Sequence, residues 1–307
     1  MNKLSVVISA WNEKAKIERT LSSVAWADEI IFVDSDSTDK TVAIAKNFTK
    51  KIFHRSNNPM LNVNKNFGFT KATGDWILSL DADEVISPEL AKEIDIVIRN
   101  PKSEIRNPNI TGYWIPRKNI IFGKWIQHGL WWPDNQLRLF RRGRGKFPEK
   151  HVHEYLVVDG PTDTLIASMI HYNYETVSQY LRKLDAIYTE SEVANLLATD
   201  YQLAWYDAIR FPVSDFLKVY FAQEGYKDGL HGLVLSLLQS FYSLVVFAKL
   251  WEKKGFRQES VSATDFDSEI KKASKELTYW TTTKKIQETG NPLRRLWLRT
   301  LRKYVTR

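Results

Sequence analysis

The sequence contains no cysteine among its 307 residues. Disulfide bonds, thiolate zinc sites and a cysteine nucleophile are therefore excluded. The N-terminal stretch MNKLSVVISAWNEK also lacks the features of a secretory signal, because its apolar run is short, leads directly into charge and has no small-residue cleavage site. We therefore expect the chain to stay in the cytoplasm.

Acidic residues are missing from the C-terminal end. Hydrophobic residues make up 43% of the chain and charged residues 26%, which indicates a globular protein. The formal net charge is +8, and the segment 291–307, NPLRRLWLRTLRKYVTR, carries arginine, lysine and aromatic side chains but no acid. Such a segment suits an anionic membrane surface. It would also suit nucleic acid or a solvated terminal helix, but we expect a membrane partner and no nucleic acid.

Long hydrophobic runs are scarce, with one exception. The segment 230–251, LHGLVLSLLQSFYSLVVFAKLW, is apolar over about one bilayer-spanning length. Three interpretations remain open: a transmembrane helix, a buried core helix, or a helix lying in or dipping into the membrane interface. We favour membrane association.

Strand and helix signals alternate in the N-terminal part. Apolar runs rich in β-branched residues predict strands at 4–9, 29–35, 50–55 and 74–84. Helical spacing of apolar residues between them predicts a mostly parallel, Rossmann-like α/β sheet with helices on both faces. Ser37 or Thr38 is expected to cap the helix after the second strand.

The remaining sequence suggests two regions. Residues 1–175 are expected to form the α/β domain, with loops and antiparallel strands at 100–175 as an elaboration. Residues 176–307 are expected to form a helical C-terminal region that contains the apolar segment and the basic tail.

Acidic residues end two of the predicted strands. Asp34 and Asp36 end the second, and Asp81 and Asp83 end the fourth. Ligands of parallel α/β sheets bind beyond the carboxyl ends of the strands. Because side chains alternate along an extended segment, Asp81 and Asp83 are predicted to point the same way and to share a Mg²⁺ or Mn²⁺ ion bound to a diphosphate. A polar strand end with a helix cap is the plainer alternative.

These acids stand within a larger set of motifs. VVISAWNE, FVDSDSTDKT and NKNFGFTKATGDWILSLDADE, in this order and spacing, resemble the family 2 inverting glycosyltransferases with the GT-A fold. The resemblance covers about residues 3–90. It implies a nucleotide-diphosphate-sugar donor and inversion at the anomeric carbon.

The resemblance also implies site residues. Asp83 and Asp81 correspond to the metal and diphosphate motif, with Asp83 the better direct metal ligand. The family usually has Pro and Tyr where this chain has Ala10 and Trp11, which alters the contact with the donor base in detail. The donor-binding positions that it implies are Ala10, Asn12, Glu13, Asp34, Asp36, Lys65, Asn66 and Asp81.

Later motifs are similar to a narrower group, the lipopolysaccharide inner-core β-glucosyltransferases. They are KWIQHGLWWPDNQLRLFRRGRGKF, HVHE, HYNYET and the apolar segment. The similarity implies transfer of a hexose, typically glucose from UDP-glucose, to a lipid-linked glycan. It also implies a location at the cytoplasmic face of the bacterial inner membrane, peripheral or shallowly inserted.

An inverting transfer needs a general base for the acceptor hydroxyl. Asp134 is the leading candidate, since it parallels the family's acid before Leu-x-Leu-Arg, and Glu154 is the alternative. A turn residue after Pro133 is the plainer interpretation of Asp134. His171 is considered as a further metal ligand, although a structural strand histidine would explain it as well.

The remaining candidates concern the donor and acceptor. Arg138 belongs to a dense basic cluster and is placed to help clamp the donor diphosphate. Trp131 and Trp132 are predicted to form an acceptor platform, and His153 to contact the acceptor.

Other functions remain open. A polyprenyl-phosphate acceptor would use the same N-terminal motifs. A nucleotidyltransferase would want a glycine-rich phosphate loop, which SAWNEKAKIE is not. An inert membrane- or nucleic-acid-binding module on the same fold is the non-enzymatic alternative. The sequence does not fix the oligomeric state.

Overall fold

The chain folds into two compact units. The computed structural model describes residues 1–58, 61–99, 109–149 and 155–305. The first unit comprises residues 1–120 and 133–173, and the second comprises 121–132 and 174–307. Residues 121–132, which we grouped with the α/β domain, therefore count with the second unit.

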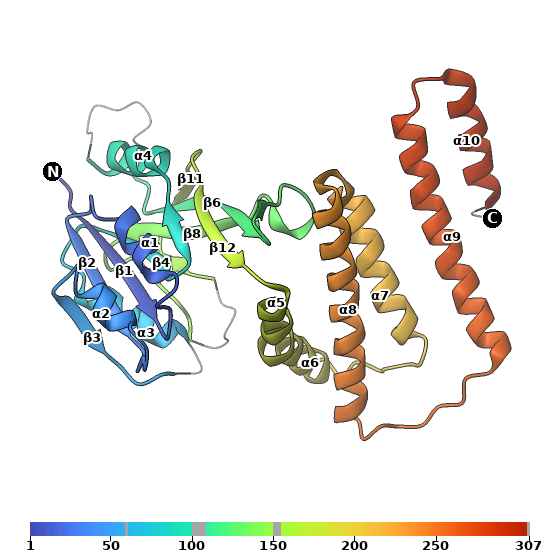
Figure 1. Cartoon of the computed structure of the whole chain (residues 1–307), viewed down its shortest axis with the longest axis horizontal. Helices are drawn as coiled ribbons and strands as arrows, with labels where there is room; N and C mark the ends of the chain where they lie inside the picture. Colours follow the sequence, from blue (N-terminus) through green and yellow to red (C-terminus); the bar gives the residue numbers. More distant parts are fainter. Residues whose placement is uncertain (59–60, 100–108, 150–154, 306–307) are drawn as a thin grey trace. The chain divides into compact units, whose positions relative to one another are not determined.

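A mixed β-sheet forms the centre of the first unit (Figure 1). Its strands lie in the order β3-β2-β1-β4-β8-β6-β12-β5. The first four of these are parallel, whereas β8 is antiparallel to both β4 and β6, and β12 is antiparallel to β5. The strands of this unit are β1 (Leu4–Ala10), β2 (Glu29–Asp34), β3 (Lys51–His54), β4 (Trp76–Asp81), β5 (Glu84–Ile86), β6 (Gly112–Ile121), β8 (Asn135–Arg141), β9 (Gly145–Lys146), β10 (Val157–Val158), β11 (Thr162–Thr164) and β12 (Met169–Tyr174). Strand β11 pairs with β6, whereas β9 and β10 form a separate two-stranded sheet.

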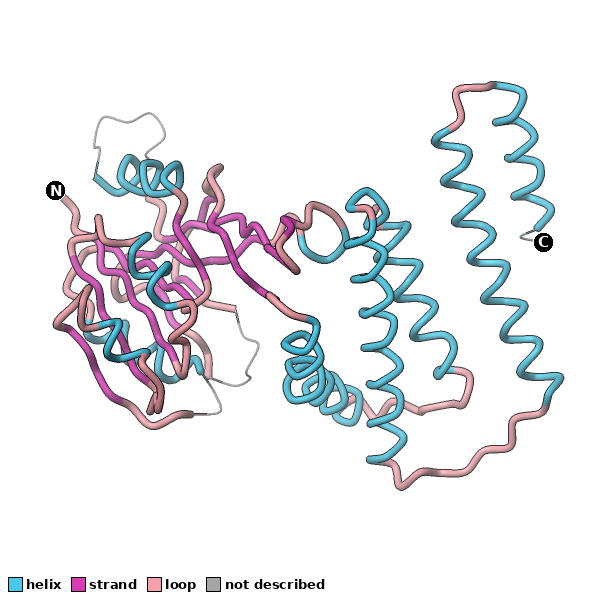
Figure 2. Tube along the Cα trace, in the orientation of Figure 1, coloured by secondary structure: helices cyan, strands magenta, loops and turns pink. Residues whose placement is uncertain are grey.

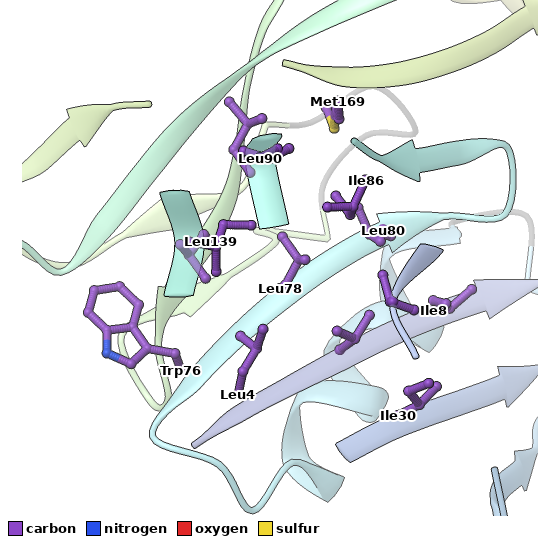
Figure 3. Close-up of a cluster of buried hydrophobic side chains, with 14 of the residues drawn as sticks. Leu4, Ile8, Ile30, Trp76, Leu78, Leu80, Ile86, Leu90, Leu139 and Met169 are labelled. Atoms are coloured by element: carbon purple, nitrogen blue, oxygen red, sulfur yellow. The ribbon is translucent and has the colours of Figure 1, made fainter. Parts of the chain in front are cut away.

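Helices cover both faces of the parallel half. They are α1 (Ile17–Ser23), α2 (Thr41–Ala45), α3 (Leu61–Lys71) and α4 (Pro88–Arg99). Alternate residues of β1 serve different cores: Val6 and Ile8 join side chains from α1 and α4, whereas Val7 joins Phe69 of α3. Figure 3 shows the first of these cores. The predicted α/β class is confirmed, with antiparallel strands continuing the parallel half.

The register of the parallel strands aligns their carboxyl ends. Ala10 at the end of β1 pairs with Asp34 at the end of β2, and Asp34 in turn pairs with His54 of β3. On the other side of β1, Ser9 pairs with Asp81 of β4. The acids that end β2 and β4 therefore lie at one edge of the sheet, on either side of β1.

The second unit is mainly helical, and every long element after Tyr174 is a helix (Figure 2). The apolar segment 230–251 forms nearly all of α8, and the basic tail forms α10. The elements are β7 (Lys124–Trp125), a 3-10 helix (Gly129–Trp131), α5 (Val177–Lys183), a π-helical turn (Leu184–Tyr188), α6 (Thr189–Ala198), α7 (Asp207–Leu217), a π-helical turn (Lys218–Ala222), a 3-10 helix (Gly225–Asp228), α8 (Leu230–Lys253), α9 (Ala263–Glu288) and α10 (Pro292–Val305).

Candidate functional site

Two loops are tied together beyond the ends of β1 and β2. Asn12 and Asp36 both have positive φ angles, 55° and 59°, a conformation that Asn and Asp tolerate better than most residues. The Asn12 side-chain oxygen accepts hydrogen bonds from the backbone N–H groups of Thr38, at 2.8 Å, and Asp39. The Glu13 N–H donates to Thr41 Oγ1 at 2.8 Å. The structure therefore brings together the two loops that carry the predicted donor-binding residues Asn12, Glu13 and Asp36.

These hydrogen bonds explain why α2 lacks the predicted cap. Neither Ser37 nor Thr38 caps that helix, which begins at Thr41 after Lys40 and has no side-chain cap. The expected cap was wrong because Ser37 Oγ instead accepts the backbone N–H of Asn12, at 3.0 Å, and the Thr38 N–H donates to the Asn12 side chain.

Asp34 lies beneath these loops and is 2% exposed. Its carboxylate is 3.0 Å from His54 Nδ1 and accepts the backbone N–H of Ser37 at 3.2 Å. Asp34 thereby holds the loop that carries the exposed Asp36. Ala10 precedes this region and is itself buried.

Helix α3 brings two predicted residues to the site. Gly68 lets α3 approach the sheet, because a Cβ there would lie 2.5 Å from a Val7 methyl carbon. Lys65 Nζ is 2.5 Å from Asp81 Oδ1. Asn66, in contrast, bonds to both the N–H and the carbonyl of Phe147 and to Glu149, so it fastens the segment around Phe147 to the helix.

The two aspartates at the end of β4 and in the following turn have separate partners. Asp81 ends the strand, whereas Ala82 and Asp83 form a turn, so the alternation on which we predicted convergence does not apply. Asp81 pairs with Lys65 and, at 2.6 Å, with Arg138. Asp83 instead lies 3.3 Å from Lys16 Nζ.

Buried ion pairs extend from Asp81 across the sheet. The Arg138 guanidinium, 5% exposed, lies 2.7 Å from Glu84, which is fully buried. Arg117 Nη1 also reaches Glu84, at 3.1 Å. Desolvation opposes ionisation of Asp81, but Arg138 and Lys65 outweigh it and hold its pKa well below its usual range. Burial likewise opposes the charge of Arg138, yet Asp81 and Glu84 raise its pKa.

Asp134 lies directly before β8 and belongs to the same network. Its Oδ2 accepts hydrogen bonds from Arg117 Nε at 2.8 Å and from Asn119 at 2.9 Å, and its Oδ1 accepts from Gln136 at 2.6 Å. Burial opposes its charge, but Arg117 and these hydrogen bonds lower its pKa. Asp134 is therefore an ionised carboxylate at neutral pH, and its side chain remains 20% exposed.

His171 on β12 connects to both sides of the network. Its Nε2 is 3.5 Å from Asp83 Oδ1, and its Nδ1 is 2.7 Å from Asn119 Oδ1. Among the described residues, no cluster of three or more His, Cys, Asp and Glu side chains could hold a metal ion. A cation at Asp83 and His171 would therefore need ligands from a bound substrate.

The roles predicted for four further residues stay predictions. Glu154 and His153 lie outside the described residues. Trp131 and Trp132 belong to the second unit, where Trp132 packs edge-on against Trp125 and Trp131 against Tyr174.

Sequence reasoning missed Arg117, Asn119 and Lys16. Arg117 and Asn119 share a face of β6 with the buried Tyr113 and Ile115. Polar residues at inward positions of an otherwise apolar strand were the available signal, because period-two alternation makes them stand out. Lys16 carried no comparable signal.

Comparison with known families decides the enzyme class. Residues 5–153 match the family model described as glycosyl transferase family 2. The chain carries a family 2 glycosyltransferase domain. The predicted enzyme class is thus confirmed, as is the predicted α/β sheet followed by C-terminal helices.

Related glycosyltransferases match over most of their length. One of Rickettsia bellii, described as uncharacterized, is 29% identical over 263 residues, 81% of this chain and 86% of the relative. The lipopolysaccharide core biosynthesis glycosyltransferase LpsC of Rhizobium meliloti is 23% identical over 266 residues, 83% of this chain and 94% of the relative.

Solved structures show a more distant likeness. That of S. aureus TarS is 15% identical, with a TM-score of 0.42 and coverage of 85% of this chain and 94% of that chain. Glucosyl-3-phosphoglycerate synthase from Mycobacterium tuberculosis, in complex with Mn²⁺ and UDP-glucose, is 20% identical, with a TM-score of 0.31 and coverage of 38% and 44%.

Proposed function

We propose that this glycosyltransferase inverts the anomeric centre as it moves a hexose, glucose from UDP-glucose as the first candidate, onto a membrane-linked glycan such as the lipopolysaccharide inner core. Two things support the proposal: the family 2 domain and the polar edge beyond β1, β2 and β4. The name of the relative LpsC agrees with the suggested acceptor.

The observation that carries the metal requirement is the charge balance of this edge. The carboxylates of Asp81, Glu84 and Asp134 together balance the positive charges of Lys65, Arg138 and Arg117 through direct ion pairs. An incoming sugar diphosphate would therefore add negative charge that these cations cannot fully compensate. A bound Mg²⁺ or Mn²⁺ ion would supply the missing positive charge and stabilise the leaving diphosphate.

The residues at Asp83 fit such an ion. A carboxylate oxygen and an imidazole nitrogen 3.5 Å apart are a donor pair that Mn²⁺ accepts, with diphosphate oxygens and water completing its shell. Asp83 and His171 would hold the metal. Asp81 would act through Lys65 and Arg138, orienting these cations toward the diphosphate.

Asp134 is the proposed base that removes the acceptor hydroxyl proton. It is ionised, partly exposed and held in one orientation by Arg117, Asn119 and Gln136. Its lowered pKa makes it a weak base, so orientation rather than basicity is its main contribution.

We also propose that the protein is peripheral to the cytoplasmic face of the inner membrane. Among the described residues, α8 is the one helix long and apolar enough to cross a membrane, and only 28% of its most apolar stretch is buried. Exposed apolar side chains run along one side of it. They are Leu230, Leu237, Phe241, Leu244 and Trp251.

The opposite side of α8 argues against spanning. Near the middle of the helix, Gln239 and Ser243 donate hydrogen bonds to Asp215 of α7. Arg210 of α7 in turn pairs with Glu269 of α9. A spanning α8 would draw Asp215 toward the centre of the bilayer, where an ionised side chain is costly. An in-plane α8, with its apolar side toward lipid and α7 toward water, avoids that cost.

Helix α10 supports the same location. Leu298 packs inward at 3% exposure, whereas Leu296 and Trp297 are about 60% exposed. The helix also carries several cations suited to anionic lipid headgroups. These are Arg294, Arg295, Arg299, Arg302 and Lys303.

A donor screen tests the transfer. Purified protein would be incubated with UDP-glucose and other nucleotide sugars, with Mn²⁺ and with or without core-lipid acceptor. We expect UDP release that depends on the acceptor and the metal. Absence of release and of UDP binding with every nucleotide sugar would contradict the proposal.

Single cysteines test the membrane orientation, because the chain has none of its own. Lys227→Cys and Lys253→Cys place an exposed thiol just before α8 and at its last residue, away from the apolar side. On sealed vesicles, an impermeant maleimide should label both from the same side if the helix lies in plane. Labelling of one end from each side would show that it spans.

A further inference from the structure

We propose that Asn119 is a positioning residue that sets the tautomer of His171 and the orientation of Asp134 with one amide group. This inference rests on the proposed roles of His171 as metal ligand and Asp134 as base. It adds a physical link between the two.

Sheet topology places Asn119 between these residues. The sheet order β8-β6-β12 puts Asn119 of β6 next to Asp134, which precedes β8, and His171 of β12. Asn119 is fully buried. Its Nδ2 donates to Asp134 Oδ2 at 2.9 Å, and its Oδ1 is 2.7 Å from His171 Nδ1.

The chemistry of the amide fixes the direction of both bonds. An ionised carboxylate only accepts hydrogen bonds, so the NH₂ group of Asn119 must face Asp134. The amide oxygen of Asn119 then faces His171 Nδ1, which must carry a hydrogen. In neutral His171 this leaves a lone pair on Nε2, the nitrogen 3.5 Å from Asp83 Oδ1.

This arrangement prepares His171 for a cation. Two lone-pair-bearing atoms, Nε2 of His171 and Oδ1 of Asp83, face one another, and a metal between them would satisfy both. Hydrogen bonding of the second imidazole nitrogen commonly orients metal-ligating histidines in this way. Asn119 would thus fix the orientation of the metal ligand His171 relative to the base Asp134.

The tautomer can be measured without metal. In ¹⁵N-histidine-labelled protein at pH 8, where an ordinary histidine is neutral, NMR should show His171 with hydrogen on Nδ1, the signals being assigned with His171→Gln. Asn119→Ala should remove that preference. Asn173 is a buried asparagine on β12, the strand of His171, and Asn173→Ala should leave the tautomer preference unchanged. Wild-type His171 with hydrogen on Nε2 would overturn the inference.

Two substitutions separate the two functions of the amide. Asn119→Asp keeps an acceptor for His171 Nδ1–H but loses the donor to Asp134, whereas Asn119→Ala loses both. We expect Asn119→Ala to weaken Mn²⁺ binding in the presence of UDP by about 10-fold or more and to lower kcat. Asn119→Asp should lower kcat while Mn²⁺ affinity stays within about threefold.

Equal loss of Mn²⁺ affinity in both variants, or unchanged affinity in Asn119→Ala, would overturn the coupling. Failure of the proposed function has a different signature, because wild-type protein would then bind no Mn²⁺ with UDP. The tautomer of metal-free His171 is read independently of that result.

Discussion

In the first unit, the carboxylates of Asp81, Glu84 and Asp134 form ion pairs with arginine and lysine side chains at one edge of the sheet. In the second unit, helix α8 leaves Leu237 and Phe241 facing outward. In the first arrangement, removing the charges from water is unfavourable, and the ion pairs must offset that free-energy cost. The second leaves apolar surface in water, which soluble proteins generally use for a partner or a membrane.

The difference separates chemistry from location. A paired, oriented set of carboxylates suits a reaction in which charge develops at fixed points. An apolar helix side without a described partner contributes little to folding and more to association. Substitutions in the two units should therefore change different properties.

The largest effect is expected at Asp83. Asp83→Asn removes the charge of the proposed metal ligand and should lower kcat/KM about 10³-fold, equivalent to several kcal/mol of transition-state stabilisation. Circular dichroism should show a folded protein. Asp163→Asn, an exposed acid on β11, serves as the control and should retain activity. Intact activity in Asp83→Asn would contradict the metal role.

The next largest effect is expected on stability, from the buried ion pairs of Glu84. Glu84→Gln leaves the charges of Arg138 and Arg117 partly uncompensated and should lower the free energy of unfolding by about 3 kcal/mol in a urea titration. The exposed Glu18→Gln should change it by less than about 0.5 kcal/mol. Equal stability of the two variants would mean that the network does not support the fold.

Asp134→Asn should lower kcat about 10²-fold, the lower end of general-base catalysis, because a carboxylate with a lowered pKa is a weak base. The KM for the donor should change little. A kcat within threefold of wild type would transfer the role of base to another residue, with Glu154 the next candidate.

Acidification tests a carboxylate at the opposite end of β2. Burial opposes ionisation of Glu29, but hydrogen bonds from Lys51, Ser5 and Thr73 outweigh it and lower its pKa to about 2 from 4.5. Because the folded pKa is the lower one, this stabilisation is complete above pH 4.5 and is lost as the pH falls toward 2. In urea titrations, the free energy of unfolding of Glu29→Gln should be lower than that of the wild type at pH 7. The two values should converge as the pH falls toward 2.

The smallest effect on stability is expected on the outer side of α8. Leu237→Ser should change the free energy of unfolding by less than about 0.5 kcal/mol but reduce binding to anionic vesicles about tenfold. Leu235→Ser, on the buried side of the same helix, should instead cost about 2 kcal/mol or more. Unchanged vesicle binding in Leu237→Ser would remove this side of α8 from the membrane surface.

Much of the fold was predictable because period-two and helical patterns are local. The strands ending at Ala10, Asp34 and Asp81 were expected within one to three residues. The different partners of Asp81 and Asp83 were not predictable, since they depend on a turn at Ala82 and on distant side chains. The positions of Arg117 and Asn119 likewise follow from the pairing of β6 with β8, which no local pattern specifies.

Calorimetry of UDP binding with Mn²⁺ or with EDTA tests the central claim, that the polar edge binds a nucleotide diphosphate through a divalent cation. We predict that Mn²⁺ raises the affinity of the wild-type protein for UDP by about tenfold or more and that Asp83→Asn abolishes this increase. Equal UDP affinity with Mn²⁺ and with EDTA, or no binding in either, would contradict the account.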